Sequence, residues 1–316
     1  MSFVLCVGEA LIDFVAQTRV NDVGASELFR RAAGGAVANV AVGIARLGGD
    51  VHFAGSLSRD AFGRFLVRTL AHENVNVDDV RIVDTPTTLA FVARGGRGAR
   101  DFFFLRNPGA DSQLSMTDIY AHELAHARGL HFGGVLLSSD PARSTCLAAA
   151  ASARRAGALV SFDPNARPQL FETADEMRRW LIAGCAQSDL VKLSEDDLAG
   201  LGMRPADAGK LINDITRAVI VSRGERGCVW MNAAGESGEV ESPRVNVVDT
   251  TGAGDAMMAA ILWRLGQTHD ARFSGDTLAD AARYGCAAGA FACMREGAIP
   301  SLPTAAELET LRSRLP

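Results

Sequence analysis

Residues Asp249 to Ala256 read Asp-Thr-Thr-Gly-Ala-Gly-Asp-Ala and combine two glycines, a small residue and a carboxylate in one short stretch. The valines before it, Val245, Val247 and Val248, indicate a strand, and residues Met257 to Leu265 indicate a helix. The octapeptide therefore lies where a strand is expected to turn into a helix.

Such a turn can bind an anion. The backbone amides of Gly252, Ala253 and Gly254 would converge into a concavity, because glycine permits the backbone angles required, and the helix N-terminus adds the positive end of its dipole. Asp255 would lie beside that concavity and could accept a proton. A phosphate site next to a base is the minimum equipment for phosphoryl transfer to a hydroxyl. Taken alone, the segment fits equally well a tight connection in which Asp255 only pairs with the helix dipole.

Other common phosphate-binding patterns do not occur. No Gly-Lys-Ser/Thr follows a glycine at the Walker A spacing, and no Gly-x-Gly-x-x-Gly follows the first predicted strand. The sequence therefore disfavours a P-loop or a dinucleotide site.

A second glycine-containing segment lies near the N-terminus, at Ala33 to Gly49. It begins with Gly34-Gly35, continues with apolar residues at helical spacing and stops at Gly48-Gly49, which is typical of a helix C-terminus. Asn39 is a lone amide on this largely apolar helix. By itself Asn39 fits a hydrogen-bonded core residue.

Together the two segments resemble the two signatures of the ribokinase-like (PfkB) family of sugar kinases, the second signature being Asp249 to Leu262. The resemblance runs from Val4 to about Pro303. Within the family the chain is most similar to fructokinases, on the evidence of Gly-Glu-Ala-Leu-Ile-Asp-Phe (8–14), Arg-Asn-Pro-Gly-Ala-Asp (106–111), Asp-Pro-Asn-Ala-Arg-Pro (163–168) and Gly-Ala-Ile-Pro-Ser-Leu-Pro-Thr (297–304).

Strand-like and helix-like segments alternate along the chain, which favours a mainly parallel sheet covered on both faces. The expected strands are Phe3–Val7, Val51–Gly55, Gly129–Leu137, Leu159–Phe162, Leu190–Lys192, Ala218–Ser222 and Cys228–Met231, and the expected helices are Val37–Leu47, Phe62–Glu73, Arg143–Ala156, Ala174–Cys185 and Ala206–Asn213. The resemblance implies a single ribokinase-like domain over residues 1–316, with three α/β/α layers and a small β-sheet lid.

Two stretches break the alternation, at about 14–32 and 87–106. In the second, Leu89 to Ala93 is expected to pair with Asp101 to Leu105 as a hairpin that turns at Gly95-Gly96-Arg97-Gly98. The resemblance assigns both stretches to the lid over the sugar, which is commonly shared with a second subunit and so implies a homodimer.

Composition narrows the class of protein. The chain has 316 residues, 48% of them apolar, and a net charge of −5 without any Lys/Arg run, which argues against a nucleic-acid partner. None of the six cysteines forms a Cys-x-x-Cys pair, and Cys6, Cys286 and Cys293 fall in apolar segments, as expected of buried thiols in a reducing compartment. Met1 leads straight into a strand, and no apolar run approaches the ~18 residues of a membrane span. We therefore expect a soluble cytoplasmic protein without a membrane partner.

The resemblance implies transfer of the ATP γ-phosphoryl group to the terminal hydroxymethyl of fructose, giving fructose 6-phosphate. Asp255 would be the general base, and the Gly252, Ala253 and Gly254 amides would form the anion hole. Asp13 is expected just beyond the carboxyl end of the first strand, the edge at which open α/β sheets bind ligands. By family position, the other expected sugar-site residues are Gly34, Gly35, Asn39, Phe104 and Arg106, with Arg167 as a further candidate.

For ATP, Ser222-Arg-Gly224-Glu-Arg-Gly227 resembles the family's Thr-x-Gly-x-x-Gly loop, although a plain hairpin turn fits the spacing as well. Lys192, Ser194 and Cys286 also match nucleotide-site positions. Ser194-x-x-Asp197 stands where the family has Asn-x-x-Glu, so Asp197 or Glu195 would hold Mg²⁺ through water, and an acidic helix start is the alternative. Some relatives bind a monovalent cation such as K⁺, and the matching positions are Asp249, Thr251, Ala292, Arg295, Gly297 and Ser301.

Several rival functions have to be weighed. His122-Glu123-Leu-Ala-His126 fits the His-Glu-x-x-His zinc-protease pattern, but the third ligand position holds Phe132, and His131 falls inside an expected strand. A nearer rival is 2-keto-3-deoxygluconate kinase, in which Arg167 would bind a carboxylate. Ribose or nucleoside kinases fit less well. A sugar-binding sensor without catalysis is the alternative from another class, and turnover of ATP would exclude it.

Overall fold

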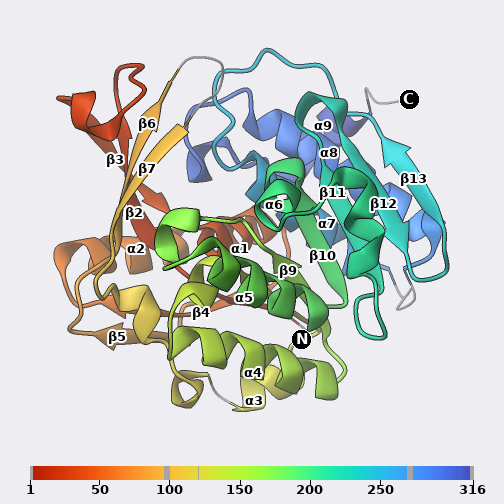
Figure 1. Ribbon diagram of the computed structural model, residues 1–316, viewed down its shortest axis with the longest axis horizontal. Helices are drawn as coiled ribbons and strands as arrows, with labels where there is room; N and C mark the ends of the chain where they lie inside the picture. The colour runs from red at the N-terminus through yellow and green to blue at the C-terminus, as the bar shows by residue number, and fades with distance from the viewer. Residues whose placement is uncertain (1–2, 96–99, 120, 269–272, 314–316) are drawn as a thin grey trace.

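Two β-sheets organise the chain in the computed structural model, which describes residues 3–95, 100–119, 121–268 and 273–313. The larger sheet has the strand order β13-β12-β11-β10-β9-β8-β1-β4-β5, and the smaller has the order β3-β2-β6-β7 (Figure 1). The strands of the large sheet are β1 (Val4–Val7), β4 (Val51–Ser58), β5 (Val80–Val83), β8 (Gly129–Gly133), β9 (Leu159–Asp163), β10 (Leu190–Ser194), β11 (Ala218–Ser222), β12 (Cys228–Asn232) and β13 (Ser237–Val240). Within it β11, β12 and β13 pair antiparallel and the other neighbours pair parallel, as predicted for a mainly parallel sheet.

Apolar side chains cover both faces of this sheet. In β1, Val4 and Cys6 belong to one buried cluster and Leu5 and Val7 to the other, as the two-residue period of a strand requires. The first cluster includes side chains of α1 (Ala36–Arg46), α2 (Ala61–His72), α7 (Ala253–Leu265), α8 (Gly275–Ala292) and α9 (Ala305–Arg312). The second includes side chains of α3 (Ala121–His126), α4 (Ala142–Arg155), α5 (Ala174–Ala186) and α6 (Glu195–Gly200). The predicted three-layer α/β/α arrangement is confirmed.

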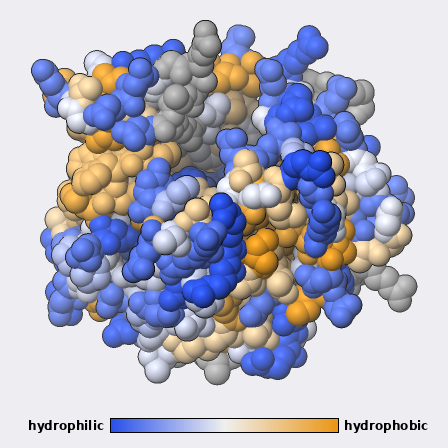
Figure 2. All heavy atoms as spheres, viewed as in Figure 1, coloured by the Kyte–Doolittle hydropathy of each residue, from blue (hydrophilic) through white to orange (hydrophobic). Residues whose placement is uncertain are grey.

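The smaller sheet forms the lid. It consists of β2 (Leu11–Ala16), β3 (Phe29–Gly34), β6 (Leu89–Arg94) and β7 (Arg100–Leu105). The predicted hairpin is correct in register, with Leu89 opposite Leu105 and Ala93 opposite Asp101, whereas most of its predicted turn lies outside the described residues. An apolar area covers this sheet in Figure 2, and the exposed apolar side chains of the lid segments are those of Leu28, Phe103 and Leu105.

Three expectations about elements were wrong, and one strand of the large sheet, β13, was not predicted. The strand at Gly129 ends at Gly133, and a 3₁₀ turn follows over Val135–Ser138; the chain passes so close to Pro164 at this point that a side chain on Gly134 would lie 1.9 Å from the Pro164 carbonyl oxygen. The predicted helix at Ala206–Asn213 is a 3₁₀ segment, Pro205–Leu211, which contains a poor helix former at Gly209.

The valine-rich approach to Asp249 is not a strand. Val247 and Val248 are 63% and 58% exposed, so they lack the sheet neighbours that a strand requires. Strand β13 was not predicted because its residues, Ser-Gly-Glu-Val, have little strand propensity. Among the described residues, no helix has the length and apolar character needed to cross a bilayer.

Candidate active site

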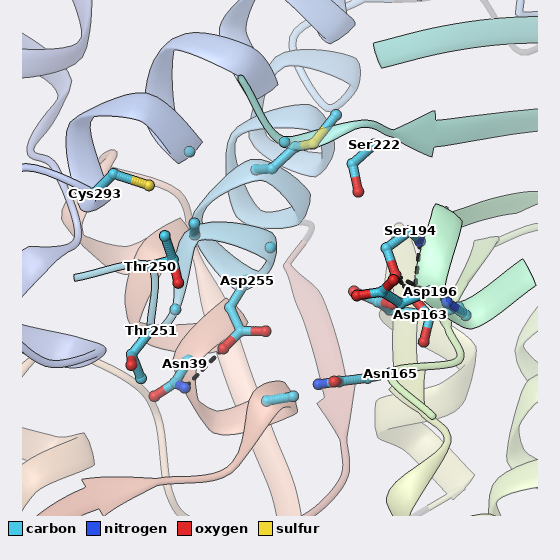
Figure 3. A pocket seen from close by; sticks show the side chains of 18 of the residues that line it. Asn39, Asp163, Asn165, Ser194, Asp196, Ser222, Thr250, Thr251, Asp255 and Cys293 are labelled. Atoms are coloured by element: carbon cyan, nitrogen blue, oxygen red, sulfur yellow. Dashed lines mark hydrogen bonds between the residues drawn. The ribbon is translucent and has the colours of Figure 1, made fainter. Parts of the chain in front are cut away.

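A cleft of about 1590 Å³ lies between the lid, the carboxyl ends of β9, β10 and β11, and the start of α7. Figure 3 shows its polar side chains, with Asn39, Thr250 and Asp255 facing Asp163, Ser194 and Asp196 across the open space. The predicted catalytic and nucleotide segments, from distant parts of the chain, thus meet in one cavity.

The glycine turn before α7 lines this cleft. Gly252 precedes the helix with φ 80° and ψ −2°, and a side chain there would lie 2.9 Å from Ala298 Cα, so only glycine fits. The Ala253 amide donates to the Thr250 carbonyl at 3.3 Å, whereas the Gly252 and Gly254 amides make no backbone hydrogen bond within the described part of the chain. The first turn therefore presents unpaired donors and a helix dipole to the cavity.

Asp255 stands at the start of α7 as the sequence predicted. Its Oδ2 accepts a 2.8 Å hydrogen bond from Asn39 Nδ2 of α1 (Figure 3). Both residues are buried, at 8% and 4% exposure. Asn39 is therefore not an isolated core amide, since it fixes the orientation of a carboxylate that could act as a base.

Lys192 places a positive charge at the same point. Its Nζ donates to Asp163 Oδ2 at 2.7 Å, and a Cβ on Gly254 would lie 3.0 Å from Nζ, so the ammonium group lies against the start of α7. Burial opposes the charged form of Lys192, but Asp163 and the more distant Asp197 and Asp255 outweigh it and raise the pKa of the ammonium. Burial raises the pKa of Asp163 to about 6, although Lys192 opposes that rise. A cation beside the α7 amides could stabilise a transferring phosphoryl group.

At the sugar end, Asp13 lines the cleft but does not follow β1 as expected. It lies within β2 of the lid, opposite Ala32 of β3. A Cβ on Gly34 would lie 2.2 Å from Asp13 Oδ2, so Gly34 leaves room for the carboxylate, and Gly35 precedes α1 with φ 106°. The register of the lid strands, which the first-strand argument ignored, sets the position of Asp13.

Glu9 is a cleft residue whose role the sequence analysis missed. Its Oε1 accepts hydrogen bonds from the amides of Ala36 at 2.6 Å and Val37 at 3.4 Å, at the start of α1. Gly35 has no side chain to cap this helix, so its amides need an external acceptor. A helix that begins after Gly34-Gly35 without a capping side chain was the sequence signal that could have pointed to such an acceptor. Burial raises the pKa of Glu9 to about 7, against the opposing effect of these hydrogen bonds.

Glu9→Gln should flatten the dependence of stability on pH. Because the folded-state pKa is raised above the ordinary 4.5, the unfolded chain releases this proton first, and the stability of the wild type falls between about pH 4.5 and 7 relative to the variant. Urea denaturation of both proteins from pH 4.5 to 8 measures the difference, in which the titrations common to both cancel. A constant difference across this range would contradict the raised pKa.

Arg106 does not line the cleft, contrary to expectation. Its side chain is 6% exposed, and it donates from Nε to Asp111 Oδ2 at 2.8 Å and from Nη1 to Ser138 Oγ at 2.6 Å. Its position at the base of the lid was predicted, but its buried ion pair was not. Sugar binding by Arg106 stays a prediction. Its contacts with Asp111 and Ser138 indicate that it stabilises the fold at the base of the lid.

Two other predicted sugar residues do line the cleft. Phe104 in β7 lies beside Phe102, with ring centroids 6.1 Å apart. Arg167 follows β9, and its guanidinium carbon lies 5.1 Å from the centre of the Phe102 ring. The cleft therefore has an aromatic wall with a cation on it.

The predicted phosphate loop joins β11 to β12, so the hairpin-turn interpretation of its spacing is confirmed, and phosphate binding by the loop stays a prediction. Ser222, Gly224 and Gly227 line the cleft, and the two glycines have φ 59° and 78°. Cys286 of α8 also lines the cleft, with its Sγ 3.5 Å from Cys228 Sγ.

The acidic start of α6 was predicted both as a metal site and as a helix cap. Ser194 and Asp197 form a capping box, and Asp197 Oδ1 also accepts from the Ala166 amide at 2.7 Å. Glu195 pairs with Arg226 at 2.5 Å. Asp196, which was not predicted, lines the cleft, is exposed and makes no hydrogen bond within the described residues. Mg²⁺ keeps several waters and needs only one or two carboxylates beside phosphate oxygens, so this donor set fits it.

The six predicted monovalent-cation positions come from two segments that are held together. Asp249 accepts from Thr251 Oγ1 at 2.8 Å and from the Gly297 amide at 2.9 Å, and its own amide donates to the Cys293 carbonyl. The remaining positions are the buried Ala292 and Ser301 and the half-exposed Arg295, which pairs with Glu307. These hydrogen bonds account for the geometry of the loop, and binding of a monovalent cation stays a prediction.

Comparisons with known proteins agree with this geometry. Residues 1–305 match the pfkB family of carbohydrate kinases. The chain belongs to this family. The probable chloroplastic fructokinase-6 of Arabidopsis thaliana is 38% identical over 308 residues, which are 96% of this chain and 80% of that protein.

Two solved structures are also similar. The fructokinase of Xylella fastidiosa with bound ATP is 32% identical, has a TM-score of 0.89 and matches 98% of both chains. A double mutant of the Vibrio cholerae O395 fructokinase, bound to fructose, ADP and a potassium ion, is 32% identical with a TM-score of 0.87, again over 98% of both chains. The predicted family, ribokinase-like fold and enzyme class are confirmed, and this pfkB kinase is a phosphotransferase that acts on a sugar hydroxyl.

Proposed function

We propose that this pfkB kinase is an ATP-dependent fructokinase, which converts D-fructose to fructose 6-phosphate. The observation that carries the proposal is the Asn39-oriented Asp255 carboxylate beside the unpaired amides of the α7 turn. The similar fructokinases, solved with ATP or with fructose and ADP, support the choice of substrates.

In the proposed reaction, Asp255 accepts the proton of the fructose hydroxymethyl as its oxygen bonds to the γ-phosphorus. The bond from that phosphorus to the β-γ bridging oxygen breaks, and ADP leaves. The α7 amides and the Lys192 ammonium stabilise negative charge on the transferring group. Asp13 of the lid orients the sugar. Ser222 and Gly224 contact the phosphates of ATP, and Cys286 lies near its adenine ring.

The proposal includes Mg²⁺ and K⁺. Asp196 and Glu195 at the start of α6 would hold Mg²⁺ through water, and the ion would neutralise charge on the phosphates. The loop around Asp249 would hold K⁺, as the potassium ion in the similar Vibrio cholerae structure suggests.

We also propose a cytoplasmic homodimer. The six free cysteines favour a reducing compartment. The exposed Leu28, Phe103 and Leu105 of the lid segments, at 64%, 52% and 50% exposure, are an apolar surface that a second lid would cover.

2-Keto-3-deoxygluconate kinase is the second candidate, because Arg167 lines the cleft and could bind a carboxylate. Assays of ADP formation with Mg²⁺ over ketoses, aldoses and keto-deoxy acids should give the highest kcat/KM with fructose. A higher kcat/KM with 2-keto-3-deoxygluconate would favour the second candidate, and no ADP formation with any sugar would favour a sensor.

Arg167→Ala sharpens this comparison. We expect it to lower kcat/KM for 2-keto-3-deoxygluconate by ~10-fold or more, since hydrogen bonds to charged groups contribute about 1.5–3 kcal/mol, and to change the value for fructose only a few-fold. Equal losses for the two sugars would mean that Arg167 does not recognise a carboxylate.

A further inference from the structure

Three potential metal ligands converge far from the cleft. His52 is the second residue of β4, Asp79 precedes β5, and Glu123 lies in α3. Their ligand atoms all lie within 4.8 Å of one another. His52 Nδ1 is 3.0 Å from Glu123 Oε2 and 3.8 Å from Asp79 Oδ2. Because His52 lies near the amino end of β4, the cluster is at the edge of the sheet opposite the kinase cleft, the edge at which Figure 1 also places α3.

The surroundings hold these side chains in place. Phe3 stacks on the His52 ring with centroids 3.8 Å apart and planes 8° apart, so the stacking holds the plane of the imidazole in place. The side chains of His52, Asp79 and Glu123 are only 17%, 4% and 12% exposed. The other oxygen of Glu123 lies 2.8 Å from Nε2 of the exposed His122. The cluster is thus a shielded, pre-ordered set rather than a group of surface charges.

One atom of the cluster is unsatisfied. Asp79 Oδ2 is buried and makes no hydrogen bond with any described residue, and it points toward the His52 nitrogen. A protonated His52 could partly offset two carboxylates, but it would still leave this oxygen without a hydrogen-bond donor. A buried polar atom without a partner is costly, and a cation among the three ligands would satisfy it.

The arrangement also resolves the His-Glu-x-x-His pattern. His126 Nδ1 lies 2.7 Å from the His122 carbonyl oxygen, so this imidazole turns back onto its own helix. His131 is buried in β8 beside Ser161. Among the described residues, neither histidine of the pattern belongs to a group of three converging metal ligands, and only its glutamate joins the cluster with His52 and Asp79.

We propose that His52, Asp79 and Glu123 bind a divalent transition-metal ion of the Zn²⁺ class. Imidazole and carboxylate ligands around Zn²⁺ lie at ~2.0–2.2 Å, which puts neighbouring ligand atoms roughly 3.3 Å apart, between the 3.0 and 3.8 Å that separate His52 Nδ1 from the two carboxylate oxygens. Imidazole favours Zn²⁺ over Mg²⁺, and a water molecule completes the coordination. The ion ties the short helix α3 to the edge of the sheet, so its role is to stabilise the fold and not to catalyse.

Zn²⁺ titration of the full-length protein after EDTA treatment and gel filtration tests this site. We expect about one Zn²⁺ per chain by isothermal titration calorimetry, and a higher Tm with Zn²⁺ than without it. Asp79→Asn and Glu123→Gln should each weaken binding more than ~10-fold and remove the Tm increase. His126→Ala, which breaks the His-Glu-x-x-His pattern but not the cluster, should bind like the wild type.

The metal-free Asp79→Asn protein provides a readout that does not depend on binding. Removing one of two neighbouring carboxylates should leave the Tm of this variant equal to or above that of the metal-free wild type. This result would show that the variant still folds and that its loss of Zn²⁺ binding has another cause. The kinase turnover of this variant should equal that of the wild type. Zn²⁺ binding that survives both carboxylate substitutions, or that is lost in His126→Ala, would overturn the proposal, as would failure of the wild type to bind Zn²⁺.

Discussion

Asp255→Asn should lower kcat by about 10²–10⁴-fold, the range expected when a general base is lost. The asparagine oxygen can still accept the 2.8 Å hydrogen bond from Asn39, so the side chain should keep its place at the start of α7. Only the capacity to take up a proton disappears. The affinity for fructose, measured by calorimetry, and the Tm should change little. The kcat of both proteins is measured at saturating ATP and fructose.

A matched control separates catalysis from the helix-dipole interpretation of Asp255. Asp276 is an exposed carboxylate in the first turn of α8, outside the cleft. Asp276→Asn should alter stability by a few tenths of a kcal/mol at most and leave kcat unchanged. If Asp255→Asn behaved like this control, Asp255 would be a dipole partner and the proposed mechanism would lose its base.

Arg106→Ala should destabilise the fold by roughly 3–5 kcal/mol, because it leaves the fully buried Asp111 carboxylate without its cation. Urea denaturation at neutral pH measures the loss. The added substitution Asp111→Asn should recover part of it, since the unpaired charge is then absent.

Arg204→Ala is the matched surface control. Arg204 pairs with Asp207 at 2.9 Å, but its side chain is 81% exposed, so solvent screens the pair and its loss should leave the urea denaturation midpoint close to that of the wild type. A wild-type stability of Arg106→Ala together with a raised fructose KM would instead restore Arg106 to the sugar-binding role that the sequence suggested.

The local geometry that the sequence predicted around the site is the part that a contiguous motif specifies. The turn before α7 depends on Gly252, whose φ of 80° and close approach to Ala298 exclude other residues, so a contiguous motif specifies it. The pairing of Asn39 with Asp255 joins residues 216 positions apart, and only the resemblance to a family brought them together. The mainly parallel α/β fold class could be predicted from local sequence, because strand-like and helix-like segments alternate along the chain.

The placements that the sequence analysis did not predict depend on contacts that form only in the folded chain. Asp111 lies only five residues after Arg106, but nothing in this local sequence reveals that Asp111, together with Ser138 from 32 residues further on, would hold the guanidinium in a buried position. The position of Asp13 depends on the pairing of β2 with β3, whereas the prediction considered only the carboxyl end of the first strand. Val247 has strand propensity, but it finds no neighbouring strand and lies exposed.

A crystal structure with fructose and a non-hydrolysable ATP analogue tests the central proposal most directly. It should place the γ-phosphate oxygens within hydrogen-bond distance of the Gly252 and Gly254 amides, and the fructose hydroxymethyl oxygen within hydrogen-bond distance of Asp255 and in line with the γ-phosphorus. A γ-phosphate bound away from the start of α7, or a fructose hydroxymethyl out of reach of Asp255, would contradict the mechanism.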